Sequence, residues 1–368
     1  MVKGGASKDR IREETGHIVG VKDINLKIEL GETFVIMGLS GSGKSTLLRH
    51  INRLIEPTTG EIFVDGDDVL KLPANQLRDL RRNKISMVFQ HFGLLPHKTV
   101  LENVASGLLV SGVAKREALT RAEEHINLVN LSGFEGSYPR QLSGGMQQRV
   151  GLARALATNA EILLMDEAFS ALDPMIRFEM QQQLLELQKR LHKTIVFITH
   201  DLDEALRIGT HVAMLKDGEQ RQVGTPEQIL LNPIDNYVRR FVMDVNRSHV
   251  VTMGSVARMG ATLSEASVDI ETIHSSINSS NDSEVVIVDD SGRPTGIATI
   301  ETLWGDGPKY LPATIIPAES VLEDALSLWK KTSCPLCVVD ATGQLVGTAS
   351  HRSILEAIAH PRGNLSRS

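Results

Sequence analysis

The sequence predicts an α/β fold in its first two thirds and a smaller α+β region in its last third. Apolar runs of strand length, such as Thr33–Met37 and Ile162–Met165, alternate with helical segments from about residue 20 to residue 224. This alternation is typical of a mainly parallel sheet covered by helices. The composition changes near residue 250, where an internal repeat begins. At 368 residues the chain is long enough for two or three domains.

The composition is that of a globular protein with a substantial core, because 41% of the residues are apolar and 23% are charged. No run approaches the roughly 20 apolar residues of a membrane span, and the segment Met1–Ala6 lacks the apolar centre of an export signal. Only two cysteines argue against a disulfide framework and suit the cytosol. A net charge of -6 gives no electrostatic reason for nucleic-acid binding, and we expect none.

Residues 38–45 read Gly-Leu-Ser-Gly-Ser-Gly-Lys-Ser, the pattern of a phosphate-binding loop. A strand precedes the loop and a helix follows it, so that backbone N–H groups and the positive end of the helix both face phosphate. This context makes an accidental glycine-rich turn a poor alternative. We expect the Lys44 ammonium to reach the β- and γ-phosphates. The predicted nucleotide-binding residues of the loop are Gly38, Ser40, Gly41, Ser42, Gly43, Lys44, Ser45 and Thr46.

Two more apolar strands end in residues suited to hydrolysis. Asp166 and Glu167 follow the first, which delivers one carboxylate to Mg²⁺ and the other to an attacking water as general base. His200 follows the second, over residues 194–199. Taken alone, the two carboxylates could equally form a solvated turn, and the histidine could be a solvated or locally bonded side chain. The residue types alone leave these alternatives open.

Residues 142–149, Leu-Ser-Gly-Gly-Met-Gln-Gln-Arg, resemble the signature of ATP-binding-cassette (ABC) ATPases. The resemblance extends over about residues 7–246 and includes the Q-loop glutamine, the D-loop over residues 170–173 and the switch histidine. It implies an α/β P-loop NTPase fold, an ABC ATPase domain with a RecA-like core and a helical subdomain. It also implies ATP and Mg²⁺ as cofactors. The implied catalytic residues are Glu167, His200 and Gln90, and the implied metal-binding residues are Ser45, Gln90 and Asp166.

In this family the signature of one subunit closes over a nucleotide that another subunit holds, which implies a head-to-tail dimer with two ATP sites. Ser143, Gly144 and Gly145 stand just before a predicted helix over residues 146–157. The N-terminus of that helix can bind a γ-phosphate only if another molecule presents it. Asp173 of the D-loop is expected at the same interface.

Within the family, the segments 34–40, 52–58, 165–174 and 200–205 are most similar to importers of glycine betaine and proline, the quaternary-amine type. This similarity implies two membrane permease subunits, an indirect substrate-binding protein and a position at the cytoplasmic face of the bacterial inner membrane. Residues 90–142 are expected to meet the permease. Three alternatives are an importer ATPase for another small solute, a soluble ABC ATPase that acts on DNA or ribosomes, and a nucleotide sensor without turnover. The presence of both Glu167 and His200 argues against the sensor.

We predict an ATPase domain over residues 1–235, a linker over 236–250 and a repeat region over 251–368. Near the first boundary, Thr225 to Gln228 read as an N-cap, a proline at the first helical position and a glutamine three residues after the cap. In the repeat region, residues 286–299 align with 337–350. Each copy reads as a strand, an Asp/Gly turn, a second strand that opens at glycine, and a helix. The copies, at about 251–305 and 309–360, resemble tandem cystathionine-β-synthase-type (CBS) domains.

Three features depart from these patterns. The N-terminal strand and adenine-stacking aromatic of ABC ATPases have no counterpart before Val21, so we expect a longer natural N-terminus; without it, ATP binding should weaken by about 1–3 kcal/mol. His17 is a possible substitute. Thr302 and Ser353 replace the aspartate with which CBS domains bind ribose, so an ionic-strength sensor or a structural role competes with nucleotide binding. Cys334 and Cys337 suggest a zinc or redox pair, but no second Cys/His cluster completes a zinc site, which favours a structural role.

Overall fold

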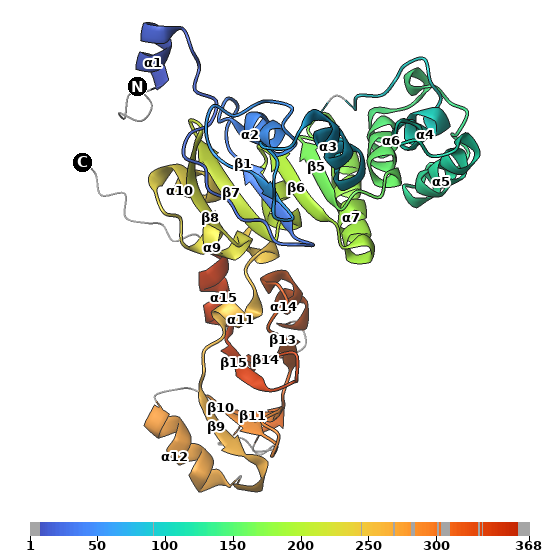
Figure 1. The fold of residues 1–368 in the computed structure, drawn as a ribbon. Coiled ribbons are helices and arrows are strands. Elements are labelled where there is room, and N and C mark those ends of the chain that lie inside the picture. Colours follow the sequence, from blue (N-terminus) through green and yellow to red (C-terminus); the bar gives the residue numbers. More distant parts are fainter. Residues whose placement is uncertain are drawn as a thin grey trace. The chain divides into compact units, whose positions relative to one another are not determined.

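The computed structural model describes two compact units, Met1–Val242 and Met243–Ser368. Figure 1 shows the course of the chain through both. The described residues are 8–90, 92–243, 245–267, 269–280, 284–299, 302, 310–329, 332 and 334–359. Within these ranges no helix is both long enough and apolar enough to span a bilayer.

The first unit is built on a six-stranded sheet in the order β4-β5-β6-β1-β7-β8. The first five strands of this order are parallel, and β8 runs antiparallel to β7. Every residue of the central strand β1 is buried, which explains its uninterrupted apolar sequence. The strands are β1 (Thr33–Met37), β4 (Ile85–Val88), β5 (Ile162–Asp166), β6 (Thr194–Thr199), β7 (His211–Lys216) and β8 (Glu219–Gly224). The predicted α/β fold is confirmed.

Helices connect the parallel strands and place their loops at one edge of the sheet. Helix α2 (Lys44–Ile51) follows β1, α7 (Pro174–Leu191) joins β5 to β6, and α8 (Leu202–Ile208) joins β6 to β7. Because ligands of open α/β sheets bind outside the carboxyl ends of the strands, the ends of β1, β4, β5 and β6 are the region that matters for function. Shorter elements are α1 (Lys8–Thr15), β2 (Phe63–Val64), β3 (Asp67–Asp68), α3 (Ala74–Asp79) and a π-helical turn (Leu80–Lys84).

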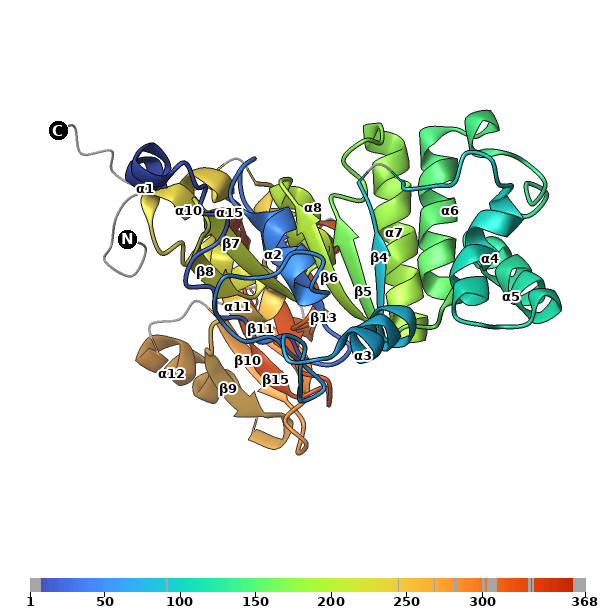
Figure 2. The same cartoon turned by 45° about the horizontal axis from the view of Figure 1, so that its top comes forward.

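Three helices form a group beside the sheet, as both ribbon views show (Figures 1 and 2). They are α4 (Val100–Val110), α5 (Lys115–Leu128) and α6 (Gly144–Ala157), and each contacts the other two. Thr99 opens α4 with a full capping box, since its side chain accepts from the Glu102 amide and the Glu102 carboxylate accepts from the Thr99 amide. A 3₁₀ turn, Pro139–Gln141, precedes α6. This group corresponds to the predicted helical subdomain.

The end of the first unit differs from the prediction. The capping box that opens α9 (Pro226–Leu231) at Thr225 is present as expected. Residues 236–242, however, were predicted as linker and instead form helix α10 (Asn236–Val242). Val238 and Val242, one helical turn apart, are buried, and the Tyr237 hydroxyl donates to the Leu215 carbonyl. Two valines spaced by four residues are a weak apolar signal in a polar segment, which is why the sequence suggested a linker.

The second unit contains two small sheets with the same internal pairing. In each, a strand pairs in parallel with the first strand of a hairpin: β9 with β10, and β13 with β14. Each hairpin is antiparallel and carries a bulge at the matching position, at Ile287/Val288 and at Val338/Val339. The strands are β9 (Ala261–Ser264), β10 (Glu284–Val288), β11 (Pro294–Thr299), β12 (Leu311–Pro312), β13 (Ile315–Pro317), β14 (Leu336–Val339) and β15 (Leu345–Ala349).

The aligned sequence copies therefore occupy equivalent places in the two sheets. The second strand of each hairpin begins two residues before the aligned glycine, so the prediction that it opens at glycine was wrong. A helix precedes each hairpin and one follows the second, while the helix predicted after β11 falls largely outside the described residues. Helices of this unit are α11 (Met253–Val256), α12 (Ile270–Ser280), α14 (Leu322–Trp329) and α15 (His351–Ile358), with 3₁₀ turns at Arg247–His249 and Glu265–Ser267.

Cys334 and Cys337 are both buried. Burial raises the pKa of the Cys337 thiol to about 12, which makes it a poor metal ligand or nucleophile. Among the residues the structure describes, no group of three or more His, Cys, Asp or Glu side chains is placed to hold a metal ion. The two cysteines belong to the packing of the second unit.

Candidate ATP site

The phosphate loop leaves β1 in a tight turn that leaves no room for side chains at two of its glycines. A Cβ on Gly38 would lie 2.2 Å from the Leu215 carbonyl oxygen. Gly43 has a φ of 95°, and a Cβ there would lie 2.4 Å from the Gly20 carbonyl oxygen. Gly43 also stands directly before α2, so the loop ends at the N-terminus of that helix, where the helix dipole is positive. The sequence pattern and the local geometry therefore agree.

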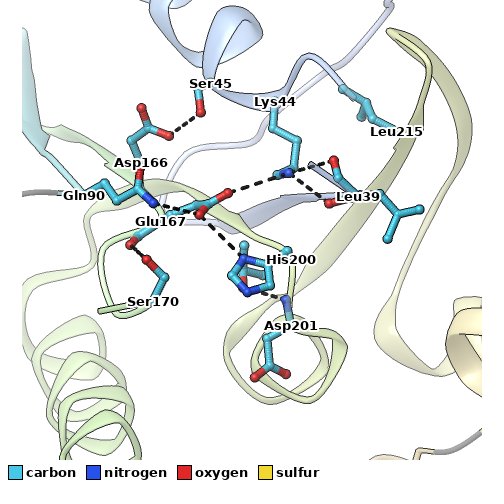
Figure 3. A network of polar contacts seen from close by, with 12 residues as sticks. Leu39, Lys44, Ser45, Gln90, Asp166, Glu167, Ser170, His200, Asp201 and Leu215 are labelled. Carbon is cyan, nitrogen blue, oxygen red and sulfur yellow. Dashed lines mark hydrogen bonds and ion pairs between the residues drawn. The ribbon is translucent and has the colours of Figure 1, made fainter. Parts of the chain in front are cut away.

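Lys44 is held inside the loop rather than extended into solvent. Its ammonium donates to the carbonyls of Gly38 at 2.8 Å and Leu39 at 3.1 Å, and lies 3.7 Å from the Glu167 carboxylate (Figure 3). Burial holds the pKa of Lys44 below its ordinary range, while the nearby Glu167 charge acts in the opposite direction. A buried ammonium group at the N-terminus of a helix is suited to bind an anion.

Asp166 ends β5 and points toward α2. Its carboxylate accepts a hydrogen bond from the Ser45 hydroxyl at 2.7 Å and pairs with the Arg49 guanidinium at 3.1 Å. Ser45 and Asp166 were predicted together as metal ligands, but Arg49 was not predicted. The signal that could have found it is spacing, because Arg49 lies four residues after Ser45 on α2 and therefore on the same helix face.

Glu167 is the centre of the site. Its Oε2 accepts from the Gln90 amide at 3.1 Å and lies 3.5 Å from Nδ1 of His200 (Figure 3). The residue has a φ of 46°, a left-handed conformation that is uncommon outside glycine and is often found at functional sites. The Ser170 hydroxyl donates to the Glu167 carbonyl at 2.9 Å and so supports this turn.

The structure thus brings Lys44, Ser45, Gln90, Asp166, Glu167 and His200 together, at the carboxyl ends of four parallel strands. Lys44, Gln90 and His200 contact Glu167, and Ser45 contacts Asp166. A cation, a hydroxyl, two carboxylates and an imidazole placed in this way can bind a polyphosphate and activate water. The Ser42 hydroxyl is buried and has no hydrogen-bond partner among the described residues, as expected for a group that binds a ligand oxygen. Thr46 is half-buried in the first turn of α2, and Ser40 and Gly41 are exposed on the loop.

The signature residues form a second group. Ser143 caps α6 by accepting from the Met146 amide, and both Ser143 and Gly144 are exposed. Gly145 is tightly packed, since a Cβ there would lie 2.5 Å from the Ile176 side chain on α7. Asp173 caps α7 by accepting from the Ile176 amide at 3.1 Å. Gly145 and Ile176 therefore bring α6 and α7 together, while Ser143 and Asp173 each bond within their own helix.

His17, the suggested substitute for an adenine-stacking aromatic, is exposed. Its Nδ1 lies 2.9 Å from the Thr15 carbonyl, immediately after α1. This contact is local, and nothing in it favours a role in nucleotide binding.

Comparison with known proteins gives a consistent result. Residues 21–170 match the family model described as ABC transporter. The chain is 44% identical to the glycine betaine/proline betaine transport system ATP-binding protein ProV of Salmonella typhimurium, over 99% of this chain and 94% of that protein. It is 57% identical to the glycine betaine transport ATP-binding protein OpuAA of Bacillus subtilis, over 72% of this chain and 63% of that protein.

Solved structures support the same relationship. A bacterial ABC transporter cassette solved as a dimer is 40% identical and matches with a TM-score of 0.54, over 58% of this chain and 93% of that one. A dimeric cassette in a post-hydrolysis state, bound to ADP and Pi, is 41% identical with a TM-score of 0.52, over 56% of this chain and 90% of that one. The predicted family is confirmed: the chain belongs to the ABC transporter family, as an ATP-binding, ATP-hydrolysing subunit.

Proposed function

We propose that this subunit drives the import of a quaternary-amine osmolyte of the glycine betaine, proline or choline type. The observation that carries the proposal is the full-length similarity to ProV, which includes the second unit as well as the ATPase. Other similar proteins are named for glycine betaine/carnitine and for trimethylamine N-oxide transport. Betaines, carnitine and trimethylamine N-oxide all carry a methylated nitrogen, so the names favour one chemical class of solute over an unrelated small molecule.

In this proposal the phosphate loop holds the β- and γ-phosphates of ATP. Its backbone amides, the α2 N-terminus and Lys44 supply positive charge, and the unpartnered Ser42 hydroxyl offers a further donor. The loop residues assigned to the nucleotide are Gly38, Ser40, Gly41, Ser42, Gly43, Lys44, Ser45 and Thr46.

Mg²⁺ fits the oxygen atoms next to the loop. The Ser45 hydroxyl and the Asp166 carboxylate already contact each other, and hydroxyl, carboxylate and amide oxygens are the ligands that this hard cation prefers. We assign Ser45, Gln90 and Asp166 to it. When bound, the ion neutralises charge on the β- and γ-phosphates.

Hydrolysis depends on Glu167. Gln90 and His200 hold its carboxylate from two sides, which positions it to accept the proton of an attacking water as general base. The exposed His200 imidazole is placed to contact the γ-phosphate, and Gln90 to orient water. Lys44 compensates the charge that the transferred phosphoryl group carries.

The signature group completes the site of a second copy of this chain. Ser143, Gly144 and Gly145 present an exposed helix N-terminus, and Asp173 lies on the neighbouring α7. An exposed N-terminus favours an anion supplied from outside. The similar cassettes described above are dimeric, which supports a head-to-tail dimer with two ATP sites.

The proposed partners are two permease subunits at the cytoplasmic face of the cell membrane and, through them, a substrate-binding protein. The exposed apolar side chains within residues 90–142 include Leu109, Val110, Phe134 and Tyr138, and they are suited to contact the permease. The second unit is proposed as a tandem CBS module that regulates transport. Ser353 donates its hydroxyl to the Ser350 carbonyl and Thr302 donates its hydroxyl to the Thr299 carbonyl, so each bonds to the residue three positions before it. These bonds favour a sensor or structural role over ribose binding.

The test is ATP hydrolysis by the parent protein beside Glu167→Gln. We expect turnover to fall by about 10²–10⁴-fold in the variant, and sizing in ATP and Mg²⁺ to show the variant as a dimer. Reconstitution with the permease and a binding protein should then give turnover that glycine betaine stimulates. Equal turnover in parent and variant would contradict the role of Glu167, and stimulation by an unrelated solute alone would contradict the solute class.

A further inference from the structure

Arg154 joins the helix that begins at the signature to the segment that follows Gln90. It lies in the last turn of α6. Its guanidinium donates from Nη1 to the Gly93 carbonyl at 2.6 Å and from Nη2 to the Phe92 carbonyl at 3.0 Å. Hydrogen bonds from a charged donor are shorter and stronger than neutral ones, so this pair is a firm link between two segments 61 and 62 residues apart in the sequence.

The turn at Phe92 and Gly93 is shaped to meet α6. Both residues have a φ of 56°, a conformation that a phenylalanine adopts only when its surroundings impose it. On α6, one turn before Arg154, a Cβ on Gly151 would lie 3.6 Å from the Phe92 carbonyl oxygen. Helix α6 therefore approaches the turn at Phe92 and Gly93 at two points one helical turn apart, Gly151 and Arg154.

The charge of Arg154 is partly removed from water. Burial lowers the pKa of its guanidinium from the ordinary range. The Gly93 and Phe92 carbonyls accept hydrogen bonds from this partly buried charge. Loss of the guanidinium would leave both carbonyl oxygens without this donor.

A second side chain fixes the remainder of the segment. Asn103, fully buried on α4, accepts from the Leu95 amide at 2.7 Å and donates to the carbonyls of Leu95, Lys98 and Thr99. The segment that starts beside Gln90 is thus held by α6 at its beginning and by α4 at its end. Gln90 itself contacts Glu167.

We propose that Arg154 is a positioning residue that couples Gln90 to the signature. A shift of Gln90, when it responds to nucleotide at Glu167, moves the turn at Phe92, and the turn moves α6 through the guanidinium. Because α6 is continuous from Gly144 to Ala157, that motion reaches Ser143. The inference rests on the head-to-tail dimer proposed above and deepens it.

The experiment compares Arg154→Gln, Arg154→Lys and the matched control Arg121→Gln. Arg121 on α5 also donates to a carbonyl of α6, that of Ala157 at 3.2 Å, but within the described ranges it makes no bond to the segment after Gln90. The readouts are the affinity for a fluorescent ATP analogue, kcat and KM for ATP, and dimer formation in a Glu167→Gln background.

We expect Arg154→Gln to bind the analogue within about twofold of the parent while its kcat falls by about tenfold, the range of a lost coupling between sites. Its dimer should need correspondingly more ATP. Arg154→Lys, which keeps the charge and can make one bond, should recover part of the loss and also serves if the glutamine variant folds poorly. Arg121→Gln should behave like the parent.

Coupling is tested separately by combining Arg154→Gln with Gln90→Ala. If the two residues act along one path, the double variant should lose no more kcat than the worse single variant. Additive losses, or equal losses in Arg154→Gln and Arg121→Gln, would overturn the inference and leave a structural role. Absence of a dimer in the Glu167→Gln parent would overturn the proposed dimer, and this inference with it.

Discussion

The phosphate loop and the signature are both glycine-rich segments that open a helix, yet they differ in what surrounds them. At the first, Lys44 is buried and contacts two loop carbonyls and Glu167. At the second, Ser143 and Gly144 are exposed, and the Ser143 hydroxyl bonds to its own helix. One helix N-terminus is completed by side chains of its own chain, and the other faces solvent.

The phosphate loop has side-chain partners within its own chain, whereas the signature presents a helix N-terminus that is open to another molecule. Asp166 and Glu167 contact the phosphate loop, and His200 contacts Glu167, because parallel strands end at one edge of the sheet. The signature lies on the helical group beside the sheet, where Gly145 packs against Ile176 of α7 and Ser143 and Gly144 are exposed. The first segment should therefore be sensitive to changes within the chain, and the second to changes in its partner.

The largest expected effect concerns two glycines of the phosphate loop. Gly43→Ala should lower the free energy of unfolding by about 1–2 kcal/mol for its left-handed conformation, plus about 1–3 kcal/mol for the overlap with the Gly20 carbonyl. Gly41→Ala is the control, because Gly41 also has a positive φ but a Cβ there meets nothing within 4 Å. Urea unfolding measures both. Equal losses would mean that the loop is not packed as the structure shows.

A smaller effect should separate two serines, one in each segment. Ser143→Ala removes a helix cap and should lower the free energy of unfolding by about 1 kcal/mol, without changing ATP binding to the single chain. Ser42→Ala removes a buried hydroxyl that has no partner among the described residues, so stability should hold or rise while ATP binding weakens. Unfolding and titration with a fluorescent ATP analogue measure the two properties. Weaker ATP binding in Ser143→Ala, together with lower stability and unchanged ATP binding in Ser42→Ala, would contradict this comparison.

The smallest effect is a pH dependence at a buried carboxyl group of α8. Glu204 on α8 is buried, and desolvation raises its pKa above the ordinary 4.5, while hydrogen bonds from Thr199 and Gln181 act in the opposite direction. The folded state therefore holds this proton at a pH where the unfolded chain has lost it. Stability falls as pH rises from about 4.5 through the raised folded pKa and is then level.

Glu204→Gln keeps the side chain neutral and tests this sign. The melting temperature of the variant relative to the parent should increase between pH 5 and pH 8, the interval above the unfolded value of about 4.5. Asp201→Asn on the same helix cap is the control for a general change of charge, and Arg177 faces both residues. A difference that is constant with pH would contradict the raised pKa.

The sequence predicted the elements whose signals are local. The phosphate loop, the strand ends at Asp166 and His200, and the cap at Thr225 each combine a residue type with a short-range backbone pattern, and the structure has them where expected. Gln90 and Glu167 are 77 positions apart, so no local pattern predicts that they share a site. That expectation came from the order of motifs in the family.

Other features could not be predicted because they depend on packing. Arg49 reaches Asp166 only once α2 and β5 lie side by side. In the sequence, Arg154 resembles any arginine near the end of a helix, and only the structure shows that it bonds to the Phe92 carbonyl. Helix α10 depends on two buried valines in an otherwise polar segment. In each case the structure depends on a contact between residues far apart in the sequence, and the periodicity of apolar residues does not predict such a contact.

In the proposed dimer, the phosphate loop of one chain and the signature of the other form one site. This shared site is tested by mixing two inactive variants, Lys44→Ala and Ser143→Arg, in equal amounts. A mixed dimer contains one site with both defects and one intact site, so random pairing should restore roughly a quarter of the parent's ATP turnover.

The control mixture is Lys44→Ala with Glu167→Gln, which should stay inactive because both residues belong to the same chain's half of the site. Recovery in the first mixture and silence in the second is the result that a shared site predicts. If the first mixture were as inactive as its two components, the shared site would be contradicted. The signature would then have no role in the ATP site of the partner chain.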